Sequence, residues 1–359
     1  MNRFLNGSIA IETKNARLNG SSRDAEDRGS SVQNISYTKK IRNRNGVFPY
    51  ASGVYVKKNI KRYALQKGMS LSSVRSISTT EAVSEGDPYA NYDEDIMGFM
   101  IASKLSLSPE EYADLDKEQQ KTFKKITKGK NVSYEKNITK KRKARLMVSP
   151  LQAISSTQIQ QEFNVRETDK TNLLYTKEIY SNIMSLGFNL DIKNVGVFRA
   201  SEDETGFRDY SVGEINNYDL KENDDGMIYL DNNIKLDRIE TTLRAIQYFN
   251  TDIAQTNNLE DLNTKFVIMS EYSIGNNVFN NIFRRGNLDI DYLIEAIDEN
   301  ENYRISPIYI GIRKGFMIYD GKDLRDILGE KLGDNSNIII DTVGEAFNSY
   351  IDFLKSSKL

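Results

Sequence analysis

The second half of the chain alternates short apolar runs with amphipathic stripes, and this alternation restricts the fold more than any other feature. Runs rich in β-branched and aromatic residues at 266–271 and 308–312 predict strands. Apolar residues at helical spacing over 236–246 and 343–354 predict helices that pack one face against a sheet. This mixture of strands and helices favours an α+β fold.

Further strands are predicted where apolar residues follow one another between turn residues. One opens the chain at 3–11, and two more are expected at 146–154 and 187–198. The pair Asp320-Gly321 predicts a tight turn after a short strand at 316–319. The polar stretch between Arg199 and Tyr229 is typical of a hairpin arm that projects from a core.

The first half contains segments of contrasting character. Residues 15–36 are rich in Gly, Ser and Asn and predict a long flexible loop. Ser52 is a good N-cap for a helix over 52–67. A Ser/Thr-rich linker at 70–84 leads into an inserted region, where Ser108-Pro109 predicts a helix over 109–128.

Several classes of chemistry are excluded because the chain has 359 residues but no cysteine and no histidine. Disulfides, thiol nucleophiles and Cys/His zinc sites are impossible, and the usual general base of hydrolases is missing. No apolar run is long enough to span a membrane and no secretory leader is recognisable, so a cytoplasmic protein without membrane partners is expected. No phosphate-binding Gly-rich motif occurs, and no cofactor is predicted.

Charge is divided unequally along the chain. The first 150 residues carry a net charge of +12 and the remainder −14, although the whole chain carries only −2. This asymmetry favours a basic surface that binds a polyanion and an acidic surface that meets another partner, such as a second copy of the chain.

The strongest local signal is a segment that is rich in basic residues and contains no acidic residue. Residues 28–80 hold eleven Lys/Arg and no Asp or Glu, and aromatic residues are interleaved with them. Proteins that bind single-stranded nucleic acid use cations to neutralise the phosphates and aromatic side chains to stack on the bases. A solvated basic helix whose aromatic residues point into the core is the alternative. A second basic tract at 121–145 holds eleven Lys/Arg against the single Glu135 and is a weaker indication.

Two acidic clusters in the basic half are candidates for a metal site. They are Asp24-Glu26-Asp27 and Asp93-Glu94-Asp95. Paired carboxylates can hold magnesium for phosphodiester hydrolysis, but neither cluster has a diagnostic spacing. Catalysis is therefore not predicted, and no metal ligand is assigned.

The order of these features resembles a known protein family. Leu5-Asn6-Gly7-Ser8, the 49–53 segment PYASG before the basic helix, the acidic 93–99 segment DEDIMGF and the 143–151 segment KARLMVSPL carry the resemblance. They are similar to segments of the repeated backbone subunit of type I CRISPR surveillance complexes, in particular the DevR group of the Cas seven family from type I-B Cascade. The resemblance covers residues 4–155 best.

The resemblance implies an RRM-like (ferredoxin-like) palm with an inserted fingers region and a β-hairpin thumb. The palm would comprise residues 1–67, 144–198 and 231–359. The fingers would span 68–143 and the thumb 199–230.

The resemblance also implies a non-enzymatic function in antiviral defence. The chain would bind crRNA as a filament of repeated copies and present it to a target DNA strand. It would do so beside the handle-binding, large and small subunits of Cascade. The alternatives are a metal-dependent endoribonuclease like those of type III complexes, which would use Asp24 or Asp27, and a general single-stranded nucleic-acid binder. The expected RNA-binding residues are Asn15, Lys39, Lys40, Arg42, Arg44, Tyr50, Ser52, Lys57, Lys58, Lys61, Arg62, Lys143 and Arg145.

Overall fold

The structure is a computed structural model that describes residues 2–20, 35–76, 82–128, 131–199, 226–253, 255–333 and 337–357. The chain folds into two compact units. The first, here called the core unit, comprises Met1–Gly68, Arg145–Val195 and Asn232–Leu359. The second, called the inserted unit, comprises Met69–Ala144 and Gly196–Asp231.

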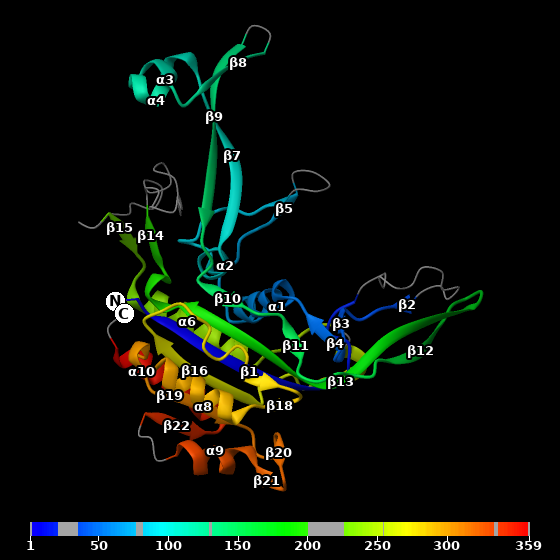
Figure 1. Ribbon diagram of the computed structural model, residues 1–359. Coiled ribbons are helices and arrows are strands. Elements are labelled where there is room, and N and C mark those ends of the chain that lie inside the picture. Colours follow the sequence, from blue (N-terminus) through cyan, green and yellow to red (C-terminus); the bar gives the residue numbers. More distant parts are fainter. Residues whose placement is uncertain are drawn as a thin grey trace. The chain divides into compact units, whose positions relative to one another are not determined.

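The core unit is built on a mostly antiparallel sheet of eleven strands (Figure 1). Its central path runs in the order β22-β19-β16-β1-β13-β11-β4-β3, and β10, β12 and β2 also pair with β13. The strands are β1 (Phe4–Ala16), β2 (Ile35–Ser36), β3 (Lys40–Asn43), β4 (Gly46–Ala51), β10 (Leu146–Val148), β11 (Leu151–Ala153), β12 (Gln160–Glu167), β13 (Asn172–Asp191), β16 (Phe266–Tyr272), β19 (Ile308–Ile312) and β22 (Ile338–Asp341).

Helices α1 (Gly53–Gln66) and α6 (Asn232–Gln247) complete a βαββαβ motif. The motif runs β1, α1, β11, β13, α6, β16, and the four strands are ordered β16-β1-β13-β11 in the sheet. This is the ferredoxin-like arrangement. The α+β fold class is therefore confirmed, and the topology is compatible with an RRM-like palm.

Both faces of the sheet are covered, which explains why every residue of β16 is buried. Phe266, Ile268 and Ile310 pack with α8 (Ile290–Glu299) and α9 (Leu324–Leu332) in one hydrophobic core. Val267 faces the other way, where Gly311 lets α10 (Val343–Ser356) approach closely: a Cβ on Gly311 would lie 2.7 Å from Val343 Cα. The remaining short elements of the core unit are α7 (Gln255–Asn258), β17 (Phe283–Arg284), β18 (Asn287–Leu288), β20 (Ile318–Tyr319), β21 (Lys322–Asp323) and the 3₁₀ turns Ile192–Asn194 and Glu301–Tyr303.

The inserted unit is a separate set of strands and short helices. Its main sheet has the order β7-β9-β8. Its elements are β5 (Arg75–Ser76), β6 (Ala82–Val83), α2 (Tyr92–Met97), β7 (Phe99–Leu107), α3 (Pro109–Ala113), α4 (Lys117–Gln120), β8 (Lys124–Lys128), β9 (Asn131–Arg142), β14 (Val197–Arg199) and β15 (Met227–Tyr229). Strands β14 and β15 pair at the base of the expected thumb, whose residues 200–225 lie outside the described residues.

Several sequence predictions were right in kind but wrong in extent. The helix over 109–128 is wrong: Ser108 does form a capping box, but α3 ends at Ala113, and β8 pairs with β9 instead. The strand over 146–154 is interrupted at Pro150, which has no N–H to donate. The strand over 187–198 ends at Asp191, because a 3₁₀ turn and Gly196, with φ of +64°, follow it.

The first residues of the segment 15–36, which was predicted to be a flexible loop, belong to the core unit. Ala16 ends β1, and both Ala16 and Leu18 are buried in the core unit. Apolar burial by these two side chains therefore fixes residues that the polar composition placed in the loop. Residues 21–34, which include Asp24 and Asp27, lie outside the described residues.

Candidate nucleic-acid interface

Helix α1 carries the densest group of predicted RNA-binding residues. Ser52 is its N-cap, and Ser52 Oγ accepts a hydrogen bond from Tyr55 N–H at 3.4 Å. Val56, Ile60 and Ala64 are buried and hold one face of the helix against the core unit. Lys58 is exposed on the other face, and Lys57 and Lys61 are half-buried. The sequence therefore folds so that the apolar stripe anchors the helix and the cations remain at the surface.

The electrostatics of Lys57 are unusual for a surface lysine. Burial lowers its pKa, and the positive charge of Lys61, one helical turn away, lowers it further. Among the described residues, Lys57 forms no ion pair with a carboxylate. Like charges at this spacing destabilise a helix, so an anion at this position would relieve the repulsion.

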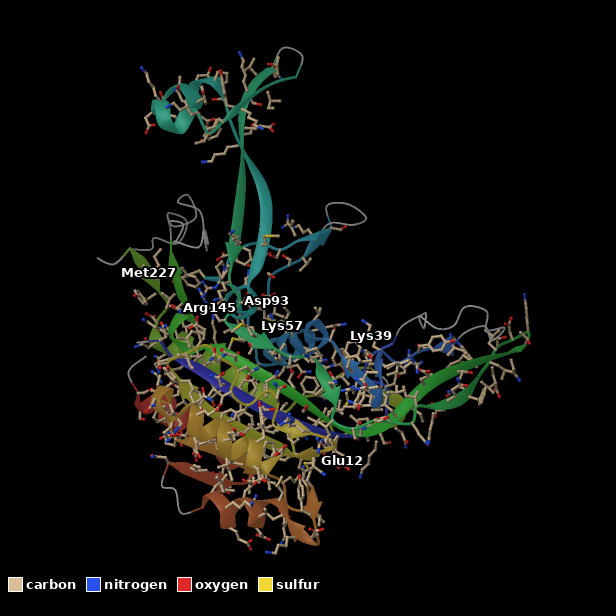
Figure 2. All side chains as sticks on the ribbon, in the orientation of Figure 1. Glu12, Lys39, Lys57, Asp93, Arg145 and Met227 are labelled. Carbon is tan, nitrogen blue, oxygen red and sulfur yellow. The ribbon has the colours of Figure 1, made fainter. Side chains whose placement is uncertain are left out.

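Strands β3 and β4 form a hairpin that leads directly into α1 through Ser52. Lys39 precedes the hairpin, and Arg42 and Arg44 are exposed on it. Figure 2 labels Lys39 near this hairpin and Lys57 on α1. Because β4 ends at Ala51 and α1 begins at Gly53, the cations of the hairpin and the helix belong to one continuous supersecondary element.

Three of the predicted cations already form ion pairs with carboxylates of the core unit. Lys40 Nζ lies 2.7 Å from Glu178 Oε1, both side chains are almost buried, and the ammonium also lies over the ring of Tyr37. Arg62 pairs with the exposed Asp252. Arg145 lies 3.7 Å from Asp191. Part of their charge is therefore compensated within the core unit.

The remaining predicted residues lie in three places. Tyr50, on β4, is half-buried, and its carbonyl accepts a hydrogen bond from Asn19 Nδ2 at 2.8 Å. Asn15 lies at the end of β1. Lys143 is exposed and belongs to the inserted unit.

Two interleaved aromatic residues are core residues rather than stacking platforms. Tyr37 and Tyr55 are 9% exposed, and burial raises the pKa of Tyr55 to about 12. For these two side chains the alternative interpretation, aromatic residues that point into the core, is right. Tyr50 and Tyr63 keep more exposed surface.

Arg17, which follows β1 in the segment interpreted as a loop, is a further cation that the sequence pattern did not single out. Its guanidinium is half-buried and donates to Ser36 Oγ, and burial lowers its pKa. No carboxylate pairs with Arg17 in the described part of the chain. A single arginine flanked by Ala and Leu gives no periodic signal, so only the tertiary structure places this cation.

The acidic cluster at 93–95 is a structural element of the inserted unit. Asp93 accepts hydrogen bonds from Ser72, and Glu94 accepts from the N–H groups of Gly86 and Asp87 at 2.6 Å. Asp95 pairs with the fully buried Arg142 and accepts from Gly196 N–H at 3.0 Å. Within the described ranges, no group of three carboxylates is arranged to hold a metal ion.

Known proteins are similar to this chain in fold. No family model and no curated protein matches the chain. Among solved structures, a chain of a "CRISPR RNA-guided surveillance complex, pre-nicking" matches with a TM-score of 0.50 and 7% sequence identity. The match covers 98% of this chain and 99% of that chain. A chain of another "CRISPR RNA-guided surveillance complex" matches with a TM-score of 0.48, 8% identity, and coverage of 98% and 99%.

The structural neighbours are thus chains of CRISPR RNA-guided surveillance complexes, and the likeness spans nearly the whole of both chains. At this level of identity the likeness concerns the fold. Separately, none of the helices in the described residues has the length and apolar character required to cross a membrane.

Proposed function

We propose that this chain is a non-catalytic, cytoplasmic backbone subunit of a type I-B Cascade, and that it binds guide crRNA. Copies of the chain would assemble as a filament along the RNA. The RNA bases would then be presented for pairing with a target DNA strand. The handle-binding, large and small subunits of Cascade would complete the complex, and sequence specificity would reside in base pairing.

One observation carries this proposal: the positive charge of Lys57 on α1 pairs with no carboxylate of the described residues. A half-buried lysine with a lowered pKa, next to a second lysine, is unfavourable unless an anion binds there. A phosphodiester backbone supplies such an anion without demanding a particular base. The fold likeness to a surveillance-complex chain supports the choice of RNA as the polyanion.

The charge division along the chain supports the filament. The first 150 residues are basic, and the rest are acidic. If the basic residues bind RNA, the acidic remainder is available to meet basic surfaces of neighbouring subunits.

Charge reversal on α1 tests the proposal. Lys57→Glu with Lys61→Glu should abolish copurification of RNA, because two phosphate contacts become two repulsions. The matched control is Lys314→Glu with Lys322→Glu, since both lysines are exposed and lie far along the chain from α1. The RNA that copurifies with the wild type should carry CRISPR repeat sequence at its ends. Retention of RNA by the α1 variant would refute the assignment of this face.

A further inference from the structure

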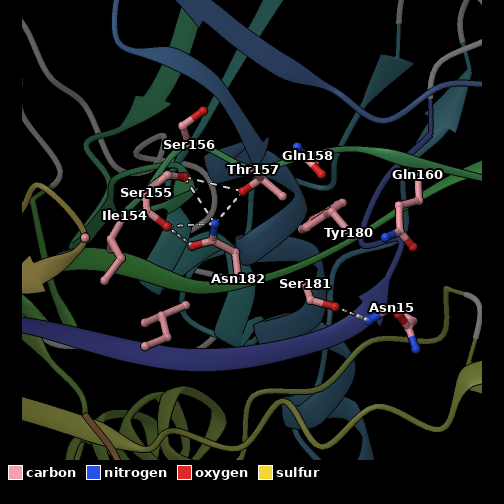
Figure 3. Close-up of a pocket in the computed structure, with 12 residues that line it drawn as sticks. Asn15, Ile154, Ser155, Ser156, Thr157, Gln158, Gln160, Tyr180, Ser181 and Asn182 are labelled. Atoms are coloured by element: carbon pink, nitrogen blue, oxygen red, sulfur yellow. Dashed lines mark hydrogen bonds between the residues drawn. The ribbon is translucent and has the colours of Figure 1, made fainter. Parts of the chain in front are cut away.

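The core unit contains a pocket that is lined mostly by residues not predicted to bind RNA. It has a volume of about 370 Å³ and lies between the end of β1, the 154–158 segment and the adjacent part of β13 (Figure 3). Cavities of about 300–1,000 Å³ are typical of small-ligand sites. Asn15 is the only one of the thirteen predicted residues that lines it.

The chemistry of the lining restricts the ligand. Amide groups line it from Asn15, Gln158, Gln160 and Asn182, and hydroxyl groups from neighbouring Ser, Thr and Tyr residues. The described lining residues include no lysine, arginine, aspartate or glutamate. A phosphate would find no counter-ion there and a metal ion no carboxylate, whereas a neutral ring with several donors and acceptors would find partners for each.

Hydrogen bonds connect several residues of the pocket wall. Asn182 Nδ2 donates to Ser155 O at 3.1 Å and also bonds to Thr157 Oγ1, as the dashed lines in Figure 3 show. Asn15 has a left-handed backbone with φ of +53°, and its N–H donates to Ser181 Oγ at 2.9 Å. By contrast, the side chains of Gln158 and Gln160 are exposed at the mouth of the pocket and form no hydrogen bond within the described part of the chain. A ligand would replace water at these two amides.

The pocket is joined to the basic hairpin. Val47 N–H donates to Ser156 Oγ at 3.1 Å, and Thr157 N–H donates to Val47 O at 2.9 Å. Gly46 is required at this contact, because a Cβ there would lie 2.0 Å from Ser156 Oγ. The hairpin that carries the exposed Arg42 and Arg44 is thus hydrogen-bonded to the pocket wall.

We infer that this pocket binds one unpaired nucleobase, either as a free nucleoside or as a base of an RNA strand held by the neighbouring cations. The strand form of this inference rests on the proposed function. The amides would bond to the polar edge of the base, and the basic hairpin would hold the flanking phosphates.

The test compares variants that remove amides inside and outside the pocket. Gln160→Leu changes a lining residue, and Gln161→Leu changes its neighbour on β12. Both side chains are exposed, but alternation along a strand places that of Gln161 on the opposite face of β12, so the pair is matched in exposure. Gln158→Leu with Gln160→Leu removes both available amides. The probes are a 12-nucleotide oligoadenylate and an abasic strand with the same number of phosphates.

We expect Gln160→Leu to weaken oligoadenylate binding about fivefold and the double variant at least tenfold, because each lost amide removes about one hydrogen bond. Gln161→Leu should bind as the wild type does, and all four proteins should bind the abasic strand equally. If the double variant binds oligoadenylate as tightly as the wild type, the nucleobase pocket is refuted while RNA binding stands.

A second arm keeps the inference testable if the chain binds no RNA, a result that would refute the proposed function. Saturation-transfer NMR with millimolar adenosine or uridine then decides. A signal with the wild type and with Gln161→Leu that disappears in the double variant supports a free nucleoside as the ligand. No signal, or the same signal with the double variant, overturns the inference.

Discussion

The buried pair of Asp95 and Arg142 should dominate the stability of the inserted unit. Neither side chain is exposed to solvent, and the pair connects α2 with the end of β9. The Arg142 guanidinium also donates to Val197 O at 3.0 Å and lies 4.6 Å from the centre of the Phe198 ring. The pair therefore joins the 69–144 segment to the 196–231 segment within this unit.

Asp95→Ala removes the carboxylate that pairs with the buried guanidinium of Arg142 and that accepts from Gly196 N–H. Breaking a buried pair in this way costs about 3–5 kcal/mol. The carbonyl oxygens of Asp95 and Val197 still accept from Arg142, so we expect a loss of about 3 kcal/mol, at the low end of this range. Asp114→Ala, an exposed position in the same unit, should change stability by less than about 0.5 kcal/mol.

Amide hydrogen exchange is the appropriate assay, because it reports local opening residue by residue. A loss of about 3 kcal/mol corresponds to roughly 100-fold faster exchange in β9 and β14. The double variant Asp95→Ala with Arg142→Met should be less destabilised than the sum of the single changes. Exchange that is unchanged in Asp95→Ala would refute the structural role of the pair, and protection of the wild type by millimolar magnesium would indicate a metal site instead.

Two further predictions concern the basic and acidic residues of the first half. Lys57→Met should raise the free energy of unfolding by about 0.2–0.5 kcal/mol at neutral pH, because it removes the repulsion with Lys61. The pKa of Lys57 in the folded chain lies below its ordinary value of 10.5, so the wild-type penalty is present at neutral pH and is lost as pH rises between those two values. Denaturation curves from pH 7 to 11 should therefore show a steeper rise for the wild type than for Lys57→Met, and equal slopes would contradict this. Asp24→Ala with Asp27→Ala should leave RNA binding and assembly unchanged, since no catalysis is proposed; magnesium-dependent cleavage of complementary RNA by the wild type that disappears in this variant would favour the endoribonuclease.

The central fold could be predicted where apolar periodicity was strong. The strands at 266–271 and 308–312 and the helices that contain 236–246 and 343–354 are all present, and most of the apolar residues that predicted them are buried. The helix after Ser52 is also confirmed, since its N-cap and apolar stripe agree. Local sequence and tertiary packing favour the same structure at these positions.

Elements without an apolar pattern could not be predicted. Strand β12 leaves Phe163 and Val165 largely exposed, so its residues show no alternation between core and solvent. On the paired part of β13 the burial does alternate, but the buried positions include the polar residues Thr176 and Glu178, which hide the pattern in the sequence. In the 109–128 segment the capping signal is real, but it describes only the first turn, and long-range pairing with β9 determines the rest.

The sequence predicted which residue types make up the candidate site, but it did not predict which side chains pair with one another. The excess of cations around α1 was visible in the sequence, whereas Glu178 lies 138 positions from Lys40 and its ion pair depends on the sheet. The pocket beside Asn15 likewise combines residues from β1, the 154–158 segment and β13. No local motif could have placed these groups together.

The salt dependence of RNA affinity tests the central claim most directly. If about four to six of the basic residues between Lys39 and Arg62 neutralise phosphates, each contributes about −0.7 to the slope of log affinity against log salt concentration. Titration of the full chain with a fluorescent single-stranded RNA between about 50 and 300 mM salt should therefore give a slope of roughly −3 to −4 per protomer. A slope near zero, with the RNA intact and bound, would contradict the assignment of α1 and the β3–β4 hairpin as the RNA-binding surface.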